Sequence, residues 1–434
     1  MRLLNWGWRF RLREQLRSSL WVVPMVFAIG AVFLNDFVED AAREITIPED
    51  QQVSAGASTT VLAMIAGSMM TITAIVFSVL TLTVQYAGAT ISPRAVRTFY
   101  RDRVVKASLG MFVGTFTYSL FAIAAADDPA RRVVVVSAAV WLAVISTAMF
   151  IVMVNHVGQG LRAASMVRRV NQATHRAINE VHPHQATIET TSPDVPAQSD
   201  EPGRIIAHDG EAGFVMAVDF KGLARHAAHR GATITLIPTV GEFISPGSQL
   251  FAVHEPRKPV STRRLTGAVA VGEERTIDHD PAFGIRILVD TAIKALSPGV
   301  NDPTTAVVAL DQIHDLLRTL ATRDLSSGQR HDQDQVLRFT ANTPSWADYL
   351  DLGLVEIAEY GAGSFQVTRR LHALLDDLQH HTPQSCRPAL AHHQQGLDQR
   401  IANAHIDPSS RHYASAPDPQ GIGSTHATYQ PEQD

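Results

Sequence analysis

A long uncharged segment, residues 57–86, limits the possible folds of this chain more than any other feature. As a helix it would rise about 1.5 Å per residue, so it would exceed the roughly 30 Å hydrocarbon core of a bilayer. A segment of this length either tilts within the membrane or extends beyond it. We therefore expect an integral membrane protein that is embedded in the lipid bilayer.

Three further apolar segments predict additional spans, at about residues 20–37, 104–126 and 133–158. Arginine and lysine cluster before the first span, after the second and after the fourth. Because such clusters stay on the cytoplasmic side, we predict a four-span domain over residues 20–160 with both termini in the cytoplasm. The short loop between the third and fourth spans carries two arginines and departs from this pattern. The expected location is the plasma (inner) membrane.

The N-terminal residues 1–19 are basic, and Leu4, Trp8, Leu12 and Leu16 recur in them every four positions. This spacing predicts a basic amphipathic helix at the lipid headgroup layer, with a plain positive flank to the first span as the alternative. The acidic residues that follow the first span lack a small-residue cleavage site. The span is therefore expected to be a retained anchor and not a signal peptide.

The uncharged span carries a polar stripe at helical spacing, with Ile75 filling the one gap. The stripe consists of Ser68, Thr71, Ser78, Thr81 and Gln85. Hydroxyl groups in spans commonly bond their own backbone or join neighbouring helices, which makes helix packing one interpretation. The other is a water-filled pathway that the stripe lines in an oligomer. The spans contain almost no ionisable residue apart from His156, which argues against a pump or a proton relay.

The second half of the chain predicts a mixed α/β cytoplasmic region. Residues 183–203 are rich in Pro, Ser, Thr and acidic residues, which is typical of a linker or mobile loop. Residues 204–278 alternate short strands with turns, and VGEFISPGSQLFAV resembles a hairpin of biotinyl and lipoyl modules, so a small β-barrel-like module is expected. Residues 279–403 indicate a mainly helical domain, and residues 404–434 read as a disordered tail.

Within the helical domain, one segment predicts two consecutive helices. The first covers about residues 281–296 and places Arg286 and Asp290 one turn apart, where they can pair. The turn SPGV ends it. Asn301 or Asp302 then caps the second helix, with Pro303 at its first position, where a missing N–H costs nothing.

Two groups of residues form the most distinctive patterns in the chain. The first group is Phe77, Ser78, Gln85, Ser92, Pro93, Arg94, Phe99, Asp102, Leu109, Gly110, Phe116 and Tyr118. The second is Phe283, Gly284, Ile285, Arg286, Asp290, Ala295, Leu296, Ser297, Pro298, Gly299, Asn301, Asp302, Pro303 and Thr305. Both groups resemble the bacterial predicted-membrane-protein family catalogued as domain of unknown function 2254, and the resemblance covers most of residues 1–370. It implies an integral membrane protein with a cytoplasmic C-terminal region, and it supplies no activity.

This chain departs from the family pattern at two positions. His279 and Ile287 stand where the family usually has glutamine. A ligand or subunit contact made by those glutamines is therefore in doubt here.

The chemistry-bearing residues do not form a recognisable catalytic or metal signature. Asp278, Asp280 and Asp290 are suitable for acid/base or metal work, but their spacing matches no metal motif, and no nucleotide-binding or hydrolase motif is present. The lone Cys386 excludes an intramolecular disulfide framework, and a formal net charge of −5 does not favour nucleic acid. We expect no cofactor, no metal and no enzymatic activity.

Three functional hypotheses remain open at this stage. The first is a homo-oligomeric channel-like assembly with a cytoplasmic gating or vestibule domain, in which the chain associates with copies of itself. The second is a membrane-anchored scaffold or ligand-sensing protein without conduction, and the third is a membrane-bound enzyme with an acidic site. Beyond the polar stripe, the candidate site residues are Ser92, Pro93, Arg94, Asp102, Arg286, Asp290, Ser297, Pro298, Gly299, Asn301, Asp302 and Pro303.

Overall fold

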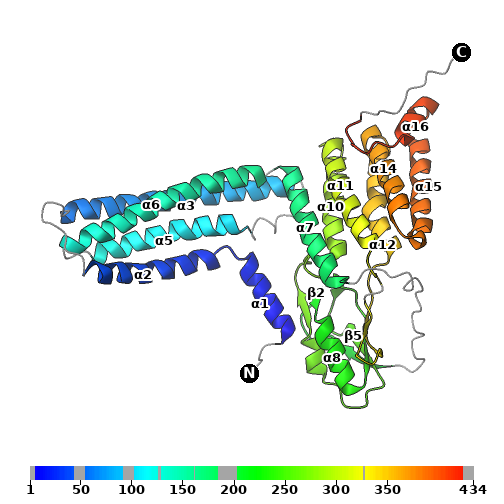
Figure 1. Ribbon diagram of the computed structural model, residues 1–434, viewed down its shortest axis with the longest axis horizontal. Coiled ribbons are helices and arrows are strands. Elements are labelled where there is room, and N and C mark those ends of the chain that lie inside the picture. The colour runs from blue at the N-terminus through cyan, green and yellow to red at the C-terminus, as the bar shows by residue number, and fades with distance from the viewer. Residues whose placement is uncertain are drawn as a thin grey trace. The chain divides into compact units, whose positions relative to one another are not determined.

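The computed structural model describes residues 5–43, 54–90, 102–125, 129–160, 162–183, 203–325 and 328–423 (Figure 1). The chain divides into two compact units. The helical unit comprises residues 15–165. The α/β unit combines residues 1–14 with residues 166–434. The predicted linker lies almost entirely outside the described residues, as do the candidates Ser92, Pro93 and Arg94.

Four long helices that lie side by side form the helical unit (Figure 1). They are α2 (Val22–Ala42), α3 (Ala55–Thr90), α5 (Arg103–Ala125) and α6 (Pro129–Gly160). Each contains a stretch that is long and apolar enough to cross a membrane, which confirms the four predicted spans as helices. Helix α5 is the most buried of the four, and it packs against α2, α3 and α6.

Glycines on α5 allow α2 to approach closely. A Cβ atom at Gly110 would lie 2.7 Å from the Phe27 ring, and one at Gly114 would lie 3.3 Å from the Phe27 carbonyl oxygen. Both distances are shorter than ordinary van der Waals contact, so α2 can pack at this separation only because these side chains are absent.

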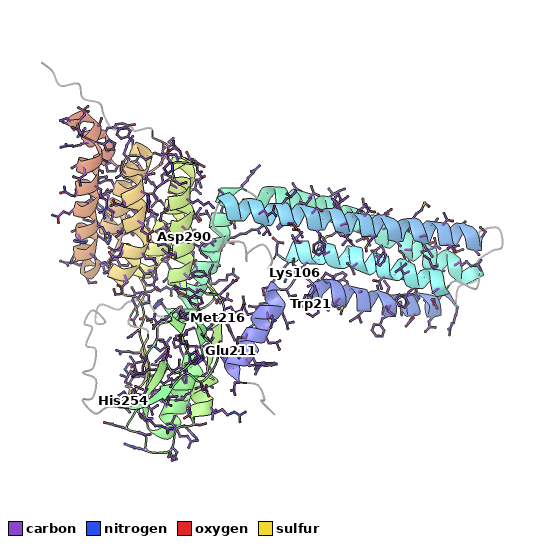
Figure 2. All side chains as sticks on the ribbon, turned by 180° about the vertical axis from the view of Figure 1, so that it is seen from behind. Trp21, Lys106, Glu211, Met216, His254 and Asp290 are labelled. Atoms are coloured by element: carbon purple, nitrogen blue, oxygen red, sulfur yellow. The ribbon has the colours of Figure 1, made fainter. Side chains whose placement is uncertain are left out.

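The N-terminal helix α1 (Trp6–Ser18) has two different apolar faces. Trp6 and Phe10 pack against a small cluster in the α/β unit that contains Met216 (Figure 2). Trp8 and Leu12 are exposed, as the predicted amphipathic spacing requires, and so is Leu16; Leu4 lies outside the described residues. A role at the headgroup layer remains a prediction for the exposed face.

Two sheets form the β part of the α/β unit. The larger has the strand order β1-β5-β3-β8-β7, in which β3 and β8 are parallel and the other neighbours antiparallel. The smaller has the order β4-β2-β6. The strands are β1 (Arg204–Ala207), β2 (Gly213–Val218), β3 (Thr233–Leu236), β4 (Phe243–Ile244), β5 (Gln249–His254), β6 (Val269–Gly272), β7 (Arg330–His331) and β8 (Leu337–Ala341). Two short helices, α8 (Phe220–Arg230) and α9 (Thr262–Thr266), lie between strands.

The described strands do not close into a barrel, so the barrel-like module predicted for residues 204–278 is not confirmed. The larger sheet instead takes β7 and β8 from beyond residue 278. Ile234 of β3 pairs with Phe339 of β8, and both side chains are fully buried in one core. About a hundred residues separate β3 from β8 in the sequence. Their pairing adds β8 at the edge of β3, where a closed barrel of residues 204–278 would have paired β3 with one of its own strands.

The remaining helices form the helical part of the α/β unit, in which α10, α11, α14 and α15 stand side by side (Figure 1). The helices are α7 (Ala163–Val181), α10 (Pro281–Ala295), α11 (Pro303–Ala321), α12 (Trp346–Leu350), η4 (Asp351–Val355), α13 (Glu356–Gly361), α14 (Phe365–His381), η5 (Gln384–Cys386), α15 (Arg387–Ala404) and α16 (Pro408–Ser415). The two helices predicted before and after SPGV are α10 and α11.

The predicted disordered tail needs correction over residues 404–423. Helix α16 lies in this segment, and it packs on α14 and α15. The buried Arg369 donates hydrogen bonds to the carbonyl oxygens of Ala416, at 3.0 Å, and Gly423, at 3.2 Å. The order of this segment therefore rests on tertiary contacts with α14 and α15, which its polar composition does not reveal. Residues 424–434 lie outside the described part.

Candidate functional site

The start of α10 is fixed by a buried carboxylate. Asp280 accepts a hydrogen bond from the Phe283 amide at 2.9 Å and caps the helix. Arg275 donates to the same carboxylate at 2.6 Å and 3.1 Å. Burial raises the pKa of Asp280, and the neighbouring guanidinium opposes that shift. Asp280 therefore has a structural partner and a capping role in this position.

A second ion cluster lies on a half-buried side of α10. Arg286 donates to Asp290 at 2.6 Å, which confirms the predicted pairing one turn apart. Its other nitrogens bind both carboxylate oxygens of Glu356, at the start of α13. The hydrogen bond from Arg286 holds the pKa of Glu356 below its usual range. Sequence reasoning missed Glu356, because nothing local connects residues that are 70 positions apart.

The turn between α10 and α11 is a tight capping structure. The carbonyl oxygen of Ser297 accepts from the amides of Val300 and Asn301, at 3.0 Å and 2.9 Å. Asn301 adopts a left-handed conformation with φ of 46°. Asp302 accepts from the Thr305 amide at 3.1 Å, so Asp302, and not Asn301, is the N-cap of α11. Pro298, Gly299 and Val300 form the exposed tip.

The acidic residues of this region do not make an obvious reaction centre. Asp280 is paired with Arg275, and Asp290 is paired with Arg286. Over the described ranges, no group of three or more His, Cys, Asp and Glu side chains is arranged to hold a metal ion. This arrangement gives the acidic-enzyme hypothesis no geometric support.

His279, one of the two positions that depart from the family pattern, contacts α1. Its ring packs edge-on against Trp6 and Phe10, with centroid distances of 6.0 Å and 5.6 Å. Burial lowers the pKa of His279, which favours the neutral ring, although Glu180 acts in the opposite direction. The other departure, Ile287, is buried. The first of these positions therefore belongs to a contact within the chain.

The polar stripe of α3 is exposed over its whole length. Each of its four hydroxyl groups donates to the carbonyl oxygen four residues earlier on α3, at 2.8 to 3.1 Å. These four hydroxyl groups therefore do not join α3 to another of the helices that the structure describes. A hydroxyl pair that sequence reasoning missed instead joins α5 to α6, because the hydroxyl oxygens of Thr115 and Ser146 are 2.9 Å apart.

Asp102 ties two spans together at one end of the helical unit. One carboxylate oxygen accepts from the Val104 amide at 2.9 Å and caps α5, and the other lies 2.7 Å from Nε2 of His156 on α6. This candidate residue thus has a packing role that its position in the sequence did not reveal.

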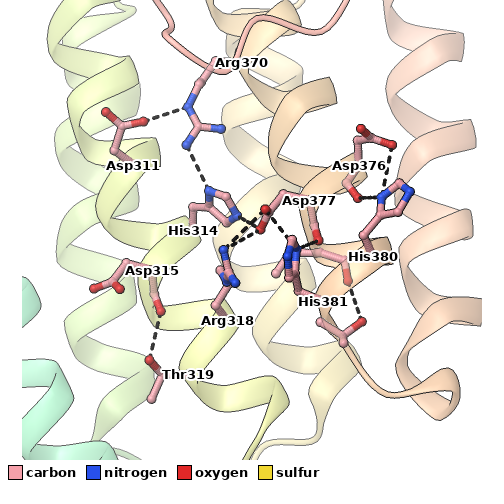
Figure 3. A network of polar contacts seen from close by, with 12 residues as sticks. Asp311, His314, Asp315, Arg318, Thr319, Arg370, Asp376, Asp377, His380 and His381 are labelled. Carbon is pink, nitrogen blue, oxygen red and sulfur yellow. Dashed lines mark hydrogen bonds and ion pairs between the residues drawn. The ribbon is translucent and has the colours of Figure 1, made fainter.

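A polar network between α11 and α14 was also missed (Figure 3). Arg370 donates to Asp311 at 2.7 Å and lies 3.0 Å from Nδ1 of His314, while Nε2 of His314 lies 2.8 Å from Asp377. Because Arg370 can only donate, Nδ1 of His314 accepts and Nε2 carries the proton. Burial lowers the pKa of His314, and the charge of Arg370 adds to the effect. The network fixes α11 against α14.

One family model matches most of the chain. The profile of the family described as Predicted membrane protein (DUF2254) matches residues 17–377. Uncharacterised proteins of Mycobacterium tuberculosis and Mycobacterium bovis are 29% identical over 384 residues, which covers 85% of this chain and 73% of each relative. No solved structure gives a significant match.

Proposed function

Because the chain belongs to the predicted-membrane-protein family of domain of unknown function 2254, whose description assigns no activity, we propose its function from its own geometry. It forms a homo-oligomeric, channel-like assembly in which α3 faces the shared axis. The α/β unit acts as a cytoplasmic gating or vestibule domain. The charge distribution along the sequence supports a plasma-membrane location with both termini in the cytoplasm.

The observation that carries this proposal is an exposed face of small residues on α3, here called the small-residue face. Its members are Gly56, Thr60, Ala63, Gly67, Thr71, Ala74, Ser78 and Thr81, all exposed and three or four positions apart. Small residues let helix backbones approach closely within a membrane, where close packing drives association. Identical copies usually bury such a face by associating into a closed, symmetric ring.

The other spans present a different surface. The exposed side chains of α2 include Phe33 and Phe37, and those of α6 include Trp141 and Ile151. Large apolar side chains of this kind suit contact with lipid tails. Helix α3 also exposes large apolar side chains, at Met70, Phe77 and Leu82, but they lie outside the small-residue face. The small-residue face is therefore the part of α3 that we expect to meet another copy.

The hydroxyl groups of the polar stripe support a hydrated axis. Each hydroxyl group donates its hydrogen to a backbone carbonyl oxygen of α3, as at Thr71 and Thr81. The lone pairs of the hydroxyl oxygens therefore remain available as acceptors on the outer side of the helix. A lining of hydroxyl acceptors and apolar groups suits water or a weakly held cation better than an anion.

The test compares matched substitutions in the full chain, reconstituted in lipid. Gly67→Leu and Ala74→Leu place bulk on the small-residue face, whereas Ala148→Leu places it on an exposed position of α6. We expect a wild-type complex of ring size by mass, ion flux in liposomes, and loss of both in the two α3 variants only. A monomeric wild type, or equal effects of all three substitutions, would contradict the proposal.

A scaffold or sensor without conduction is the second candidate, favoured by the preformed, exposed turn at residues 298–301. An oligomer that conducts no ion under any voltage, tension or pH would move the function to this alternative. In that case Asn301→Ala should alter the binding of a partner without altering the mass of the oligomer. Unchanged partner binding and stability would remove this alternative as well.

A further inference from the structure

A cavity in the α/β unit has the properties of a ligand site that the proposed function does not use. It has a volume of about 530 Å³ and lies where α8, the end of α9 and the first turn of α1 meet. This volume falls in the usual range for small-molecule sites, roughly 300–1,000 Å³. We call it the basic cavity.

Four side chains that carry or can accept positive charge line the basic cavity. They are Arg225, His226 and His229 of α8 and Arg264 of α9. Asp219 is the one acidic side chain in the lining, and its carboxylate already accepts from the Gly222 amide at 2.8 Å to cap α8. Within the described part of the chain, neither lining guanidinium forms an ion pair with a carboxylate. The cavity therefore holds an excess of positive charge.

His226 adds a buried polar atom to the lining of the basic cavity. Its side chain is 6% exposed, and its Nε2 atom is buried without a hydrogen-bond partner among the described residues. A buried polar atom without a partner is uncommon and costly in a folded protein. An anionic oxygen in the cavity would accept from Nε2 and remove that cost.

The electrostatic surroundings of His226 agree with this geometry. Burial lowers its pKa, and the nearby positive charges of Arg264 and Arg230 lower it further. A bound anion would act in the opposite direction and favour the protonated ring.

The wall of the cavity is rigidly built on the side of α1. The Gly7 amide donates to the carbonyl oxygen of Gly267 at 2.9 Å. A Cβ atom at Gly7 would lie 2.3 Å from the Val269 carbonyl oxygen, so this turn of α1 is in direct backbone contact with the sheet. Trp6, which precedes Gly7 and lines the cavity, is stacked on Phe10.

We propose that the basic cavity binds a phosphate group, carried by a soluble metabolite or by a lipid head group. Arg264 and Arg225 bind the phosphate oxygens at the exposed mouth, and Nε2 of His226 donates from the buried side. Because Asn5 and Trp6 form part of the wall, the bound phosphate also stabilises the docking of α1, which leads through three residues into the first span.

The test uses the full chain in nanodiscs of phosphatidylcholine, titrated with inorganic phosphate. Hydrogen exchange of residues 220–230 reports on α8, and that of residues 6–12 reports on α1. We expect slower exchange in both segments with phosphate. Arg264→Gln should weaken the apparent affinity about tenfold or more, since it removes one charge-assisted contact. Arg263→Gln is the matched control, because Arg263 is on the same helix and outside the lining.

A second series places phosphatidic acid in the nanodisc and omits free phosphate. Protection in this series alone, lost in Arg264→Gln and kept in Arg263→Gln, assigns the phosphate to a lipid head group. If Arg264→Gln fails to fold, Arg225→Gln replaces it. The proposal is overturned if neither phosphate source alters exchange, or if the Arg263 control loses as much affinity as Arg264→Gln. These readouts do not involve ion flux, so their failure is separate from failure of the channel-like assembly.

Discussion

At the scale of single residues, the α/β unit contains buried polar groups whose protonation state the fold determines. His182 is fully buried beside Tyr349, with Nε2 3.4 Å from the tyrosine oxygen. Burial lowers the pKa of His182 to about 4, although Asp324 acts in the opposite direction. The neutral ring is thus built into the folded state.

This shift predicts a loss of stability in mild acid. The unfolded histidine binds a proton below about pH 6.5, whereas the folded one stays neutral down to about pH 4, so stability falls as the pH decreases through this window. Between pH 6.5 and 5 the loss from this group is about 2 kcal/mol. His182→Gln should show a correspondingly smaller decrease in thermal midpoint, whereas His412→Gln, at an exposed position, should behave as wild type. Equal decreases in all three proteins would contradict the assignment.

The turn before α11 permits a second prediction at this scale. Asp302→Ala removes the cap and should cost about 1 kcal/mol, which accelerates exchange of the first-turn amides of α11 about fivefold. Asn301→Gly should be neutral or slightly stabilising, because glycine adopts the positive φ without strain. The account of this turn fails if Asn301→Gly destabilises α11 more than Asp302→Ala.

At the scale of elements, the parts of the structure that local sequence determines could be predicted, and the parts that tertiary contacts determine could not. The starts of α10 and α11 could be predicted, since proline and a preceding aspartate act within one turn. The pairing of β3 with β8, the order of α16 and the contact of Arg286 with Glu356 could not be predicted, because each depends on residues far apart in the sequence. The polar stripe of α3 could be predicted from the spacing of its residues. Its exposure could not be predicted, because exposure depends on how the four helices pack.

Helix packing in the helical unit can be tested at Gly110. Gly110→Ala should separate α2 from α5 and lower the thermal midpoint, with a cost of about 1–3 kcal/mol, because the new methyl group would meet the Phe27 ring at 2.7 Å. Phe27→Leu in the same chain should restore part of the loss. Gly30→Ala on α2 is the control, since its Cβ would meet no atom within 4 Å. A Gly110→Ala protein as stable as this control would show that the close approach does not occur.

At the scale of the whole molecule, the chain is a membrane protein with four apolar helices and a mixed α/β unit. Within one chain, one face of α3 stays exposed. The small-residue face and the polar stripe both lie on that surface. The proposed association of copies through α3 would account for both features, and the proposed hydrated axis would account for the outward hydroxyl oxygens. The central claim is therefore that α3 meets α3.

The most direct test of this claim is cysteine cross-linking in a background that replaces the lone natural cysteine, Cys386→Ser. Thr71→Cys lies on the small-residue face, and Val144→Cys lies on the exposed face of α6. In membranes under oxidising conditions, the account predicts disulfide-linked dimers for Thr71→Cys, access of a water-soluble thiol reagent to its uncross-linked fraction, and neither result for Val144→Cys. A monomeric Thr71→Cys protein that the reagent does not reach would contradict the account.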